Sequence, residues 1–487
     1  MSSRQAHFDW QIVNDGDDEG WKRLVAHHIG DPARRVRGWR DRYLNLTTLF
    51  LVGTLLAAMA FFVRLYWLAE QEVAEVETEL RHTLDLEQWA QEQETQAFST
   101  RLIDDQAAAD WRWRMTSESQ KGALPFGPQP EAEEIEVEEV QLRDRLALVK
   151  VRITVNYGQL GTRSFRAVRF YRETPDGWVR TEPNAAFMGA PRVMESERFI
   201  VHFRSRELNA VLAVLPRLDQ VYGTIRTNYG LPDQGEKVAV ELALADTPFA
   251  PTSRVISGQW VVVASPSLLP APVDYSEEEI LYQSVVTSLV DRVRRESRPF
   301  HLQPMDSAIA LWQLYAAGGL LGAQRDSLVA LTMIPDQTNG KNESPNALAR
   351  VDHCYLYWLL DRTYSASALD HACLLQPRSG PPSTSLSGNL SGLIDGPDFP
   401  PDPTGDLYEA GAFGPRPYSA LVWELLVSYG VQTYGPGRLP ALSSALRDGK
   451  AWVDIVPAVY GVPWEKFQAE WFAWLGDQYG LSIEADL

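Results

Sequence analysis

Cysteine is scarce in this chain, because its 487 residues include only Cys354 and Cys373. A disulfide-rich secreted scaffold is therefore excluded, and two cysteines without a second pair nearby do not make a zinc knuckle. Two interpretations stay open for the pair. Either one disulfide closes the short loop between Cys354 and Cys373, or both residues are buried thiols.

Basic stretches interleaved with aromatic residues are also missing, apart from one short arginine cluster before residue 43. Nucleic acid is therefore not an expected partner. The net charge is −19 and the isoelectric point is about 4.9, a balance that suits a soluble domain facing water. Hydrophobic residues make up 45% of the chain, so a large core is available. The length predicts two or three domains.

Charge is absent from Tyr43–Val63, YLNLTTLFLVGTLLAAMAFFV. A helix rising about 1.5 Å per residue over this stretch reaches about 30 Å, the thickness of a bilayer's hydrocarbon core. Tyr66 and Trp67 follow it, where amphipathic rings settle at the membrane interface. The stretch predicts a transmembrane helix rather than a buried soluble helix. The apolar run and the region before it are too long for a cleaved signal peptide, which favours an uncleaved signal anchor.

The two sides of this span carry opposite charge. By the positive-inside rule, residues 1–42 are predicted to be a cytoplasmic tail and the domains after residue 63 to be extracytoplasmic. The basic cluster is expected to contact anionic lipid head groups of the bilayer. Localisation in the cell membrane follows, as a single-pass protein. The cluster consists of Arg34, Arg35, Arg37, Arg40 and Arg42, and the acidic residues after the span are Glu70, Glu72, Glu75, Glu77 and Glu79.

Proline and glycine are absent from Arg64–Ser119, where apolar residues recur every three to four positions. This pattern predicts a continuing helix, with residues 64–84 as a stalk. A homodimer through the stalk is one predicted partner arrangement, although the heptads are irregular. Lys121–Pro130 then breaks the helix with its glycines and prolines.

Residues 135–181 alternate between apolar and polar side chains, which predicts three strands. The tetrapeptide Thr174-Pro175-Asp176-Gly177 has the composition of a hairpin turn. A helix followed by an antiparallel sheet ending in FYRETPDGWVRTEP resembles the nuclear transport factor 2-like superfamily. The resemblance implies an α+β domain over 85–189 that holds a small ligand or dimerises.

The blocks that follow read strand, helix, strand, strand and buried helix. They are ERFIVHF, a helix closing in YGTIRTNYGLP, KVAVELALA, QWVVVA and YSEEEILYQSVVTSLVDRVRRESR. Together with the C-terminal blocks YSALVWELLVSYG and GVPWEKFQAEWFAWL, they resemble the peptidase MA-like, or gluzincin, domains of bacterial proteins. The resemblance implies such a domain over 190–487, mostly helical with a small sheet.

Those peptidases bind zinc through His-Glu-x-x-His on the buried helix and a glutamate from the next helix. Aligned here, Gln283 and Thr287 stand at the histidine positions, Ser284 at the general base and Ala317 at the third ligand. All four functional groups are missing together, and amide and hydroxyl oxygens are poor zinc ligands. The resemblance therefore implies a degenerate motif in a pseudoenzyme.

Patterns of other enzyme classes are absent as well. The chain has no G-x-S-x-G, no G-x-x-x-x-G-K-[ST] and no G-x-G-x-x-G. None of His202, His301, His353 and His371 stands four residues from another histidine, so a rebuilt metal site is not expected. We therefore predict no catalytic residue, no metal and no cofactor. The segment 376–417 is rich in Pro, Gly and Ser and predicts a mobile loop.

The expected fold class is α+β and multidomain, with a transmembrane helix, a small helix-plus-sheet domain and a mostly helical C-terminal domain. The preferred function is membrane-anchored binding or scaffolding. The substrate cleft that the peptidase resemblance implies would then bind a peptide, a glycan or a protein. One alternative is a divergent hydrolase whose site lies around Gln283, Glu278 or His301. Another is a transmembrane sensor that signals through the N-terminal tail.

Overall fold

The computed structural model divides into two compact units, Met1–Glu75 and Val76–Leu487, and each is described by itself. The predicted tail up to residue 36, the loop 376–417, His301, His371 and Cys373 lie outside the described residues. The structure describes residues 37–92, 100–118, 131–158, 161–232, 237–246, 260–297, 304–333, 347–360, 419–448 and 452–479.

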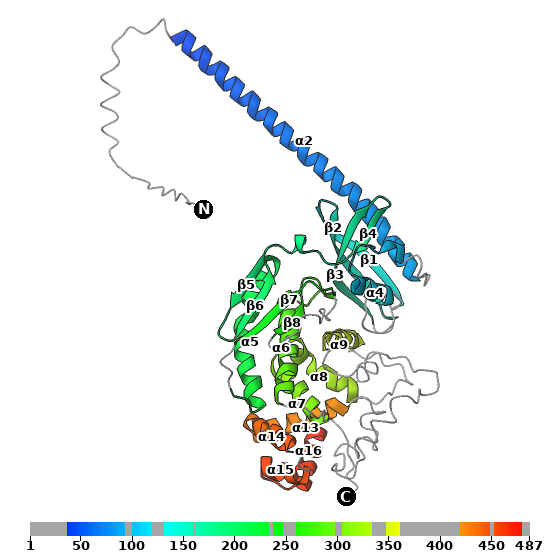
Figure 1. The fold of residues 1–487 in the computed structure, drawn as a ribbon, viewed down its shortest axis with the longest axis vertical. Helices are drawn as coiled ribbons and strands as arrows, with labels where there is room; N and C mark the ends of the chain where they lie inside the picture. Colours follow the sequence, from blue (N-terminus) through cyan, green and yellow to red (C-terminus); the bar gives the residue numbers. More distant parts are fainter. Residues whose placement is uncertain are drawn as a thin grey trace, which may run out of the picture. The chain divides into compact units, whose positions relative to one another are not determined.

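Helix α2 (Arg37–Glu92) is 56 residues long and contains the boundary between the units. Within it, Thr48–Leu68 is long and apolar enough to cross a membrane, and none of its 21 residues is buried. This stretch overlaps the predicted span Tyr43–Val63 over residues 48–63. One helix of membrane-spanning length and composition near the N-terminus is therefore confirmed (Figure 1).

The last turns of α2 pack on the first sheet. Leu80 and Leu84 belong to the hydrophobic core, and the carboxylate of Glu79 accepts a hydrogen bond from the indole of Trp178 at 3.1 Å. Residues assigned to the stalk are thus buried within their own chain. A homodimer through the stalk stays a prediction, and it would have to use other positions.

The prediction of one helix across Arg64–Ser119 is wrong. Helix α2 ends at Glu92, and a 3-10 turn η1 (Thr100–Leu102) precedes helix α4 (Ala109–Glu118). Between η1 and α4, the buried carboxylate of Asp104 accepts hydrogen bonds from Thr181 at 2.8 Å and from the backbone N–H of Gln106 at 2.9 Å. A short polar side chain that binds nearby backbone competes with the helix.

The first sheet is antiparallel in the order β1-β2-β3-β4, as the alternating pattern predicts. The turn Thr174–Gly177 joins β3 to β4, and Gly177 adopts a φ of +115° that favours glycine. A short strand, β9, pairs with Phe165 and Arg166 of β3, on the same edge of β3 as β4. The strands are β1 (Ala132–Arg143), β2 (Leu146–Asn156), β3 (Thr162–Thr174), β4 (Gly177–Thr181) and β9 (Ala271–Pro272).

The second sheet is mixed, in the order β5-β6-β7-β8. β5 is antiparallel to β6, whereas β6, β7 and β8 run parallel. Alternate residues of β6 are buried, and helices α5 and α6 contact the sheet (Figure 1). The elements are η4 (Ala185–Phe187), β5 (Pro191–Glu195), β6 (Phe199–Arg204), η5 (Ser205–Glu207), α5 (Leu208–Asn228), β7 (Val238–Ala243), β8 (Trp260–Ala264) and α6 (Glu277–Ser297).

The remaining helices complete one continuous hydrophobic core that also draws residues from both sheets. A mixed helical and sheet fold is therefore confirmed, while the domain boundary between residues 189 and 190 stays a prediction. The helices are α7 (Pro304–Ala316), α8 (Leu320–Met333), α9 (Ala347–Leu360), α13 (Ser419–Tyr434), η7 (Pro436–Arg438), α14 (Leu439–Arg447), α15 (Trp452–Tyr460) and α16 (Trp464–Tyr479).

Candidate functional site

Helix α6 carries three of the four degenerate motif positions. The helix begins with a capping box formed by Ser276 and Glu279. Ser276 Oγ accepts from the backbone N–H of Glu279 at 3.2 Å, and the Glu279 carboxylate accepts from the backbone N–H of Ser276 at 2.9 Å. Apolar residues of α6 fill the core on both sides of Gln283. The cap and this packing hold the backbone at Gln283 and Thr287 in place.

The side chain of Gln283 is 1% exposed, and both of its polar atoms are hydrogen-bonded. Its carbonyl Oε1 accepts from the backbone N–H of Leu321 at 3.0 Å, and its amide Nε2 donates to Thr287 Oγ1 at 3.3 Å. Thr287 Oγ1 in turn donates to the backbone carbonyl of Gln283 at 2.8 Å. Leu321 lies in the first turn of α8, where backbone N–H groups have no partner inside the helix. Gln283 thus caps α8.

The turn between α7 and α8, residues 317–319, is held against α6. Tyr282 donates its hydroxyl to the carbonyl of Ala317 at 2.6 Å, and a Cβ added at Gly319 would lie 2.6 Å from Gln283 Oε1. Arg217 of α5 lies 3.8 Å from the centroid of the Tyr282 ring and donates to the carbonyl of Gly318 at 3.4 Å. The fourth motif position, Ala317, therefore lies beside the other three as part of a packed turn.

The chemistry of this site is neutral. An amide, a hydroxyl and a backbone N–H satisfy one another, and none of these groups is a strong metal ligand or a base. Ser284 is half-buried, and its backbone carbonyl accepts from Ser288 Oγ at 3.0 Å. Among the residues that the structure describes, no group of three or more His, Cys, Asp and Glu side chains is placed to hold a metal ion.

The histidines and cysteines of the sequence analysis are spread through the fold. His202 lies on β6 with its ring 5.1 Å from that of Trp260. Cys354 is buried in α9, and its proposed partner Cys373 lies outside the described ranges, so the disulfide stays a prediction. His353 belongs to α9, but its side chain is outside the described set.

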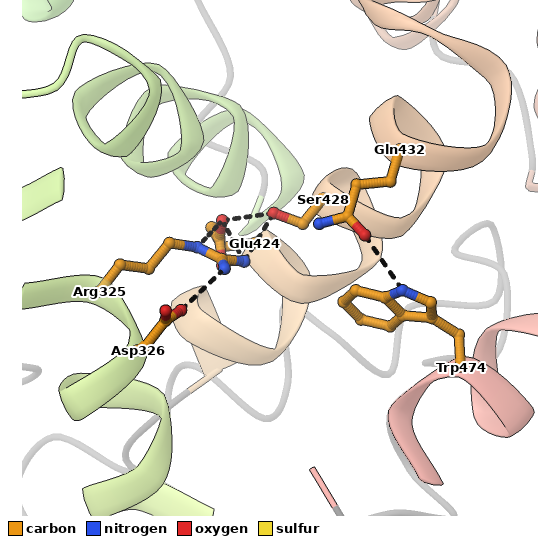
Figure 2. A network of polar contacts seen from close by, with 6 residues as sticks. All are labelled: Arg325, Asp326, Glu424, Ser428, Gln432 and Trp474. Atoms are coloured by element: carbon orange, nitrogen blue, oxygen red, sulfur yellow. Dashed lines mark hydrogen bonds and ion pairs between the residues drawn. The ribbon is translucent and has the colours of Figure 1, made fainter. Parts of the chain in front are cut away.

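A charged cluster that the sequence analysis missed joins α8 to α13 (Figure 2). Glu424 is 0% exposed, and its carboxylate pairs with Arg325 at 3.2 Å and accepts from Ser428 Oγ at 2.7 Å. Arg325 also donates to Ser428 at 2.8 Å and pairs with Asp326 at 3.6 Å. Burial raises the pKa of Glu424, although Arg325 and Ser428 oppose the shift. The signal was a lone acid in the apolar run SALVWELLVSYG, because a buried carboxylate requires a partner.

A second charged cluster was also missed. The guanidinium of Arg163 on β3 lies 2.8 Å from Asp352 of α9 and 2.8 Å from Asp274, which follows β9. Burial and the neighbouring carboxylate of Asp274 raise the pKa of Asp352 to about 6, while Arg163 opposes the shift. This cluster ties the first sheet to α9. Like the Arg325 cluster, it has the geometry of a structural ion pair rather than of an acid–base pair open to substrate.

Comparisons with known proteins add no family to these observations. No protein-family model, no curated protein and no solved structure matches this chain.

Proposed function

We propose that this protein is a single-pass membrane protein whose extracytoplasmic part binds or scaffolds and does not catalyse. The observation that carries the proposal is Gln283. At the position where a gluzincin would have its first zinc ligand, a buried amide caps α8 and bonds to Thr287. The side chains at Gln283 and Thr287 are an amide and a hydroxyl bonded to each other, which supports the proposal because neither is a strong zinc ligand or a general base.

The membrane anchor supports the same proposal. Thr48–Leu68 is apolar, of spanning length and exposed along its length. The arginines before the span and the glutamates after it favour a cytoplasmic N-terminus. Protease added to intact cells should degrade the chain after residue 68 and leave an N-terminal tag intact. Protection of the C-terminal region in the same experiment would contradict the orientation.

Zinc content tests the loss of catalysis. The purified full chain, loaded with zinc and then dialysed, should retain far less than one equivalent. Tightly held zinc in a 1:1 ratio would overturn the proposal, as would cleavage of a peptide library that is abolished by Gln283→Ala.

Restoring the motif tests the gluzincin resemblance directly. A variant carrying Gln283→His, Ser284→Glu, Thr287→His and Ala317→Glu places two imidazoles one helical turn apart with a carboxylate from the adjoining turn. We expect it to gain about one equivalent of bound zinc. The matched control, Ser284→His with Ser288→His, has the same spacing on a neighbouring face of α6 and no third ligand. Equal zinc affinity of the two variants would contradict the resemblance.

The described contacts do not favour a divergent hydrolase at Gln283, because the two hydrogen bonds of its side chain go to the hydroxyl of Thr287 and the backbone N–H of Leu321. The cleft ligand, whether peptide, glycan or protein, stays a prediction. The sensor alternative makes a different prediction, since it requires the tail 1–42 to bind a cytoplasmic protein. Retrieval of lipid alone by a tail peptide would count against it.

A further inference from the structure

Helix α9 is tied to the first sheet by a guanidinium that two carboxylates share. Arg163 of β3 donates to Asp352 of α9 at 2.8 Å, and it also lies 2.8 Å from Asp274, which follows β9. We call these three residues the Arg163 cluster. When both carboxylates are ionised, one positive and two negative charges leave the cluster with a net charge of −1. The first sheet and α9 thus meet where one cation faces two anions.

The excess negative charge is least favourable on Asp352. The side chain of Asp274 is 55% exposed, so water solvates its charge, whereas the side chains of Arg163 and Asp352 are 16% and 12% exposed. Burial disfavours the charged form of a carboxylate, and a counterion shared with a second carboxylate compensates it only in part. A proton on Asp352 removes the excess charge and leaves one balanced pair, Arg163 with Asp274. Burial and the charge of Asp274 accordingly raise the pKa of Asp352 to about 6, although Arg163 opposes the shift.

The groups around the Arg163 cluster are neutral near pH 6. The ring of Tyr275 lies 6.0 Å from the guanidinium carbon of Arg163, and its hydroxyl accepts from the amide of Gln324 on α8 at 3.3 Å. Burial raises the pKa values of Tyr275 and of Tyr157, which follows β2, so both phenols keep their protons. Helices α6 and α8 also contact α9, and none of their described residues forms an ion pair with Asp352. Asp352 is therefore the group of the cluster whose charge changes near pH 6.

We propose that the Arg163 cluster is a pH-sensitive latch, which holds α9 on the first sheet in acidic surroundings and loosens it as the surroundings become neutral. When a helix opens locally, its buried side chains meet water, and Asp352 there regains its ordinary affinity for protons. The docked helix holds this proton more tightly than the opened helix does. Docking is therefore favoured at low pH and weakens as the pH rises through about 6.

The latch changes how often α9 opens and not whether the chain is folded. Apolar residues of α9, among them Val351, Tyr355 and Leu356, belong to the hydrophobic core and hold the helix at any pH. With a pKa of 3.8 when opened and about 6 when docked, the ratio of docked to opened helix falls about tenfold between pH 5 and pH 8. The inference goes beyond binding or scaffolding and does not depend on the loss of catalysis.

Hydrogen exchange of the full chain in lipid nanodiscs tests the latch. The protection factor of an amide is its intrinsic exchange rate divided by its measured rate, so it already corrects for the effect of pH on the chemistry of exchange. For the amides of α9 this factor should fall about tenfold between pH 5 and pH 8. The amides of α5 are the internal control and should show a much smaller change. An α9 protection factor that does not depend on pH, or an equal change in α5, would overturn the proposal.

Three variants assign the pH dependence to the Arg163 cluster. Asp352→Asn should make the α9 protection factor constant across this range, because an amide neither gains nor loses a proton. Asp274→Asn removes the second, exposed carboxylate and should reduce the change, whereas His353→Gln, next to Asp352 in the sequence, should leave it at about tenfold. Circular dichroism establishes that the variants are folded. A pH dependence that survives Asp352→Asn, or that disappears in His353→Gln, would refute the latch. Neither result would alter the zinc or topology tests of the proposed function.

Discussion

Two buried polar sites on α8 differ in charge. At its first turn, the backbone N–H of Leu321 is bound by the neutral amide of Gln283. One turn further along, the guanidinium of Arg325 lies 3.2 Å from the carboxylate of Glu424 on α13. Both sites join helices that are distant in sequence, yet only the second holds charge, and there each charge has a partner. The comparison teaches that helices of this region are joined both by a buried ion pair and by a neutral hydrogen bond.

Removing Glu424 should have the largest effect. Glu424→Ala leaves Arg325, whose side chain is 17% exposed, without its main counterion. We expect a loss of about 3 kcal/mol in the free energy of unfolding, because breaking a buried ion pair leaves an uncompensated charge. Denaturant unfolding followed by tryptophan fluorescence measures it. Asp326→Ala is the control, since Asp326 is 94% exposed and also pairs with Arg325. Equal losses of unfolding free energy in the two variants would show that the buried pair stabilises the fold no more than the exposed pair does.

The neutral site is broken by adding one methyl group. Gly319→Ala places a Cβ 2.6 Å from Gln283 Oε1, which forces the amide away from Leu321. We expect a loss of about 2 kcal/mol, the usual penalty for a buried hydrogen bond left unmade. Gly437→Ala has open space around its Cβ and should be nearly neutral. Hydrogen exchange at the Leu321 amide should accelerate only in the first variant, and unchanged exchange would refute the cap.

The Arg163 cluster predicts a pH effect. The pKa of Asp352 is raised from 3.8 to about 6 in the folded chain, so the folded state holds this proton more tightly than the unfolded state. Stability from this group is therefore present at low pH and is lost as pH rises through about 6. Asp352→Asn should remove that dependence. The change that it causes in the free energy of unfolding should therefore be more favourable at pH 8 than at pH 4.5, by about 1–2 kcal/mol. Thermal unfolding across this range measures it. A difference between the two chains that does not vary with pH would contradict the assignment.

Exposed ion pairs of the first sheet should matter least. Glu138 pairs with Arg152 at 2.5 Å, but their side chains are 33% and 47% exposed. Glu138→Gln should change the free energy of unfolding by less than about 0.5 kcal/mol, because water and salt screen such pairs. A loss as large as that of Glu424→Ala would remove the distinction between buried and exposed charge on which the comparison depends.

Local patterns were sufficient to predict much of the fold. The alternation in residues 135–181, the turn at Gly177 and the capped start of α6 are decided by residues close together in the sequence. The partners of Gln283 and Glu424 could not be predicted in this way. Leu321 N–H is 38 residues from Gln283, and Arg325 is 99 residues from Glu424. Only the folded chain brings them together.

The break at Asp104 shows the same limit in a helix. The composition of residues 64–119 favours a helix throughout, and no proline or glycine marks its end. In the non-helical segment before α4, the Asp104 carboxylate accepts instead from Thr181, 77 residues later. Tertiary contacts of this kind override local propensity. The use of the Gln283 amide as a helix cap could not be predicted from local sequence for the same reason.

The cap on α8 limits which residues can replace Gln283. A single change of Gln283 to histidine gives up both side-chain hydrogen bonds before Thr287, Ser284 or Ala317 has changed. The loss is coupled, because the same amide holds the first turn of α8 through Leu321 and the next turn of α6 through Thr287. Selection for stability alone is therefore enough to preserve glutamine at this position.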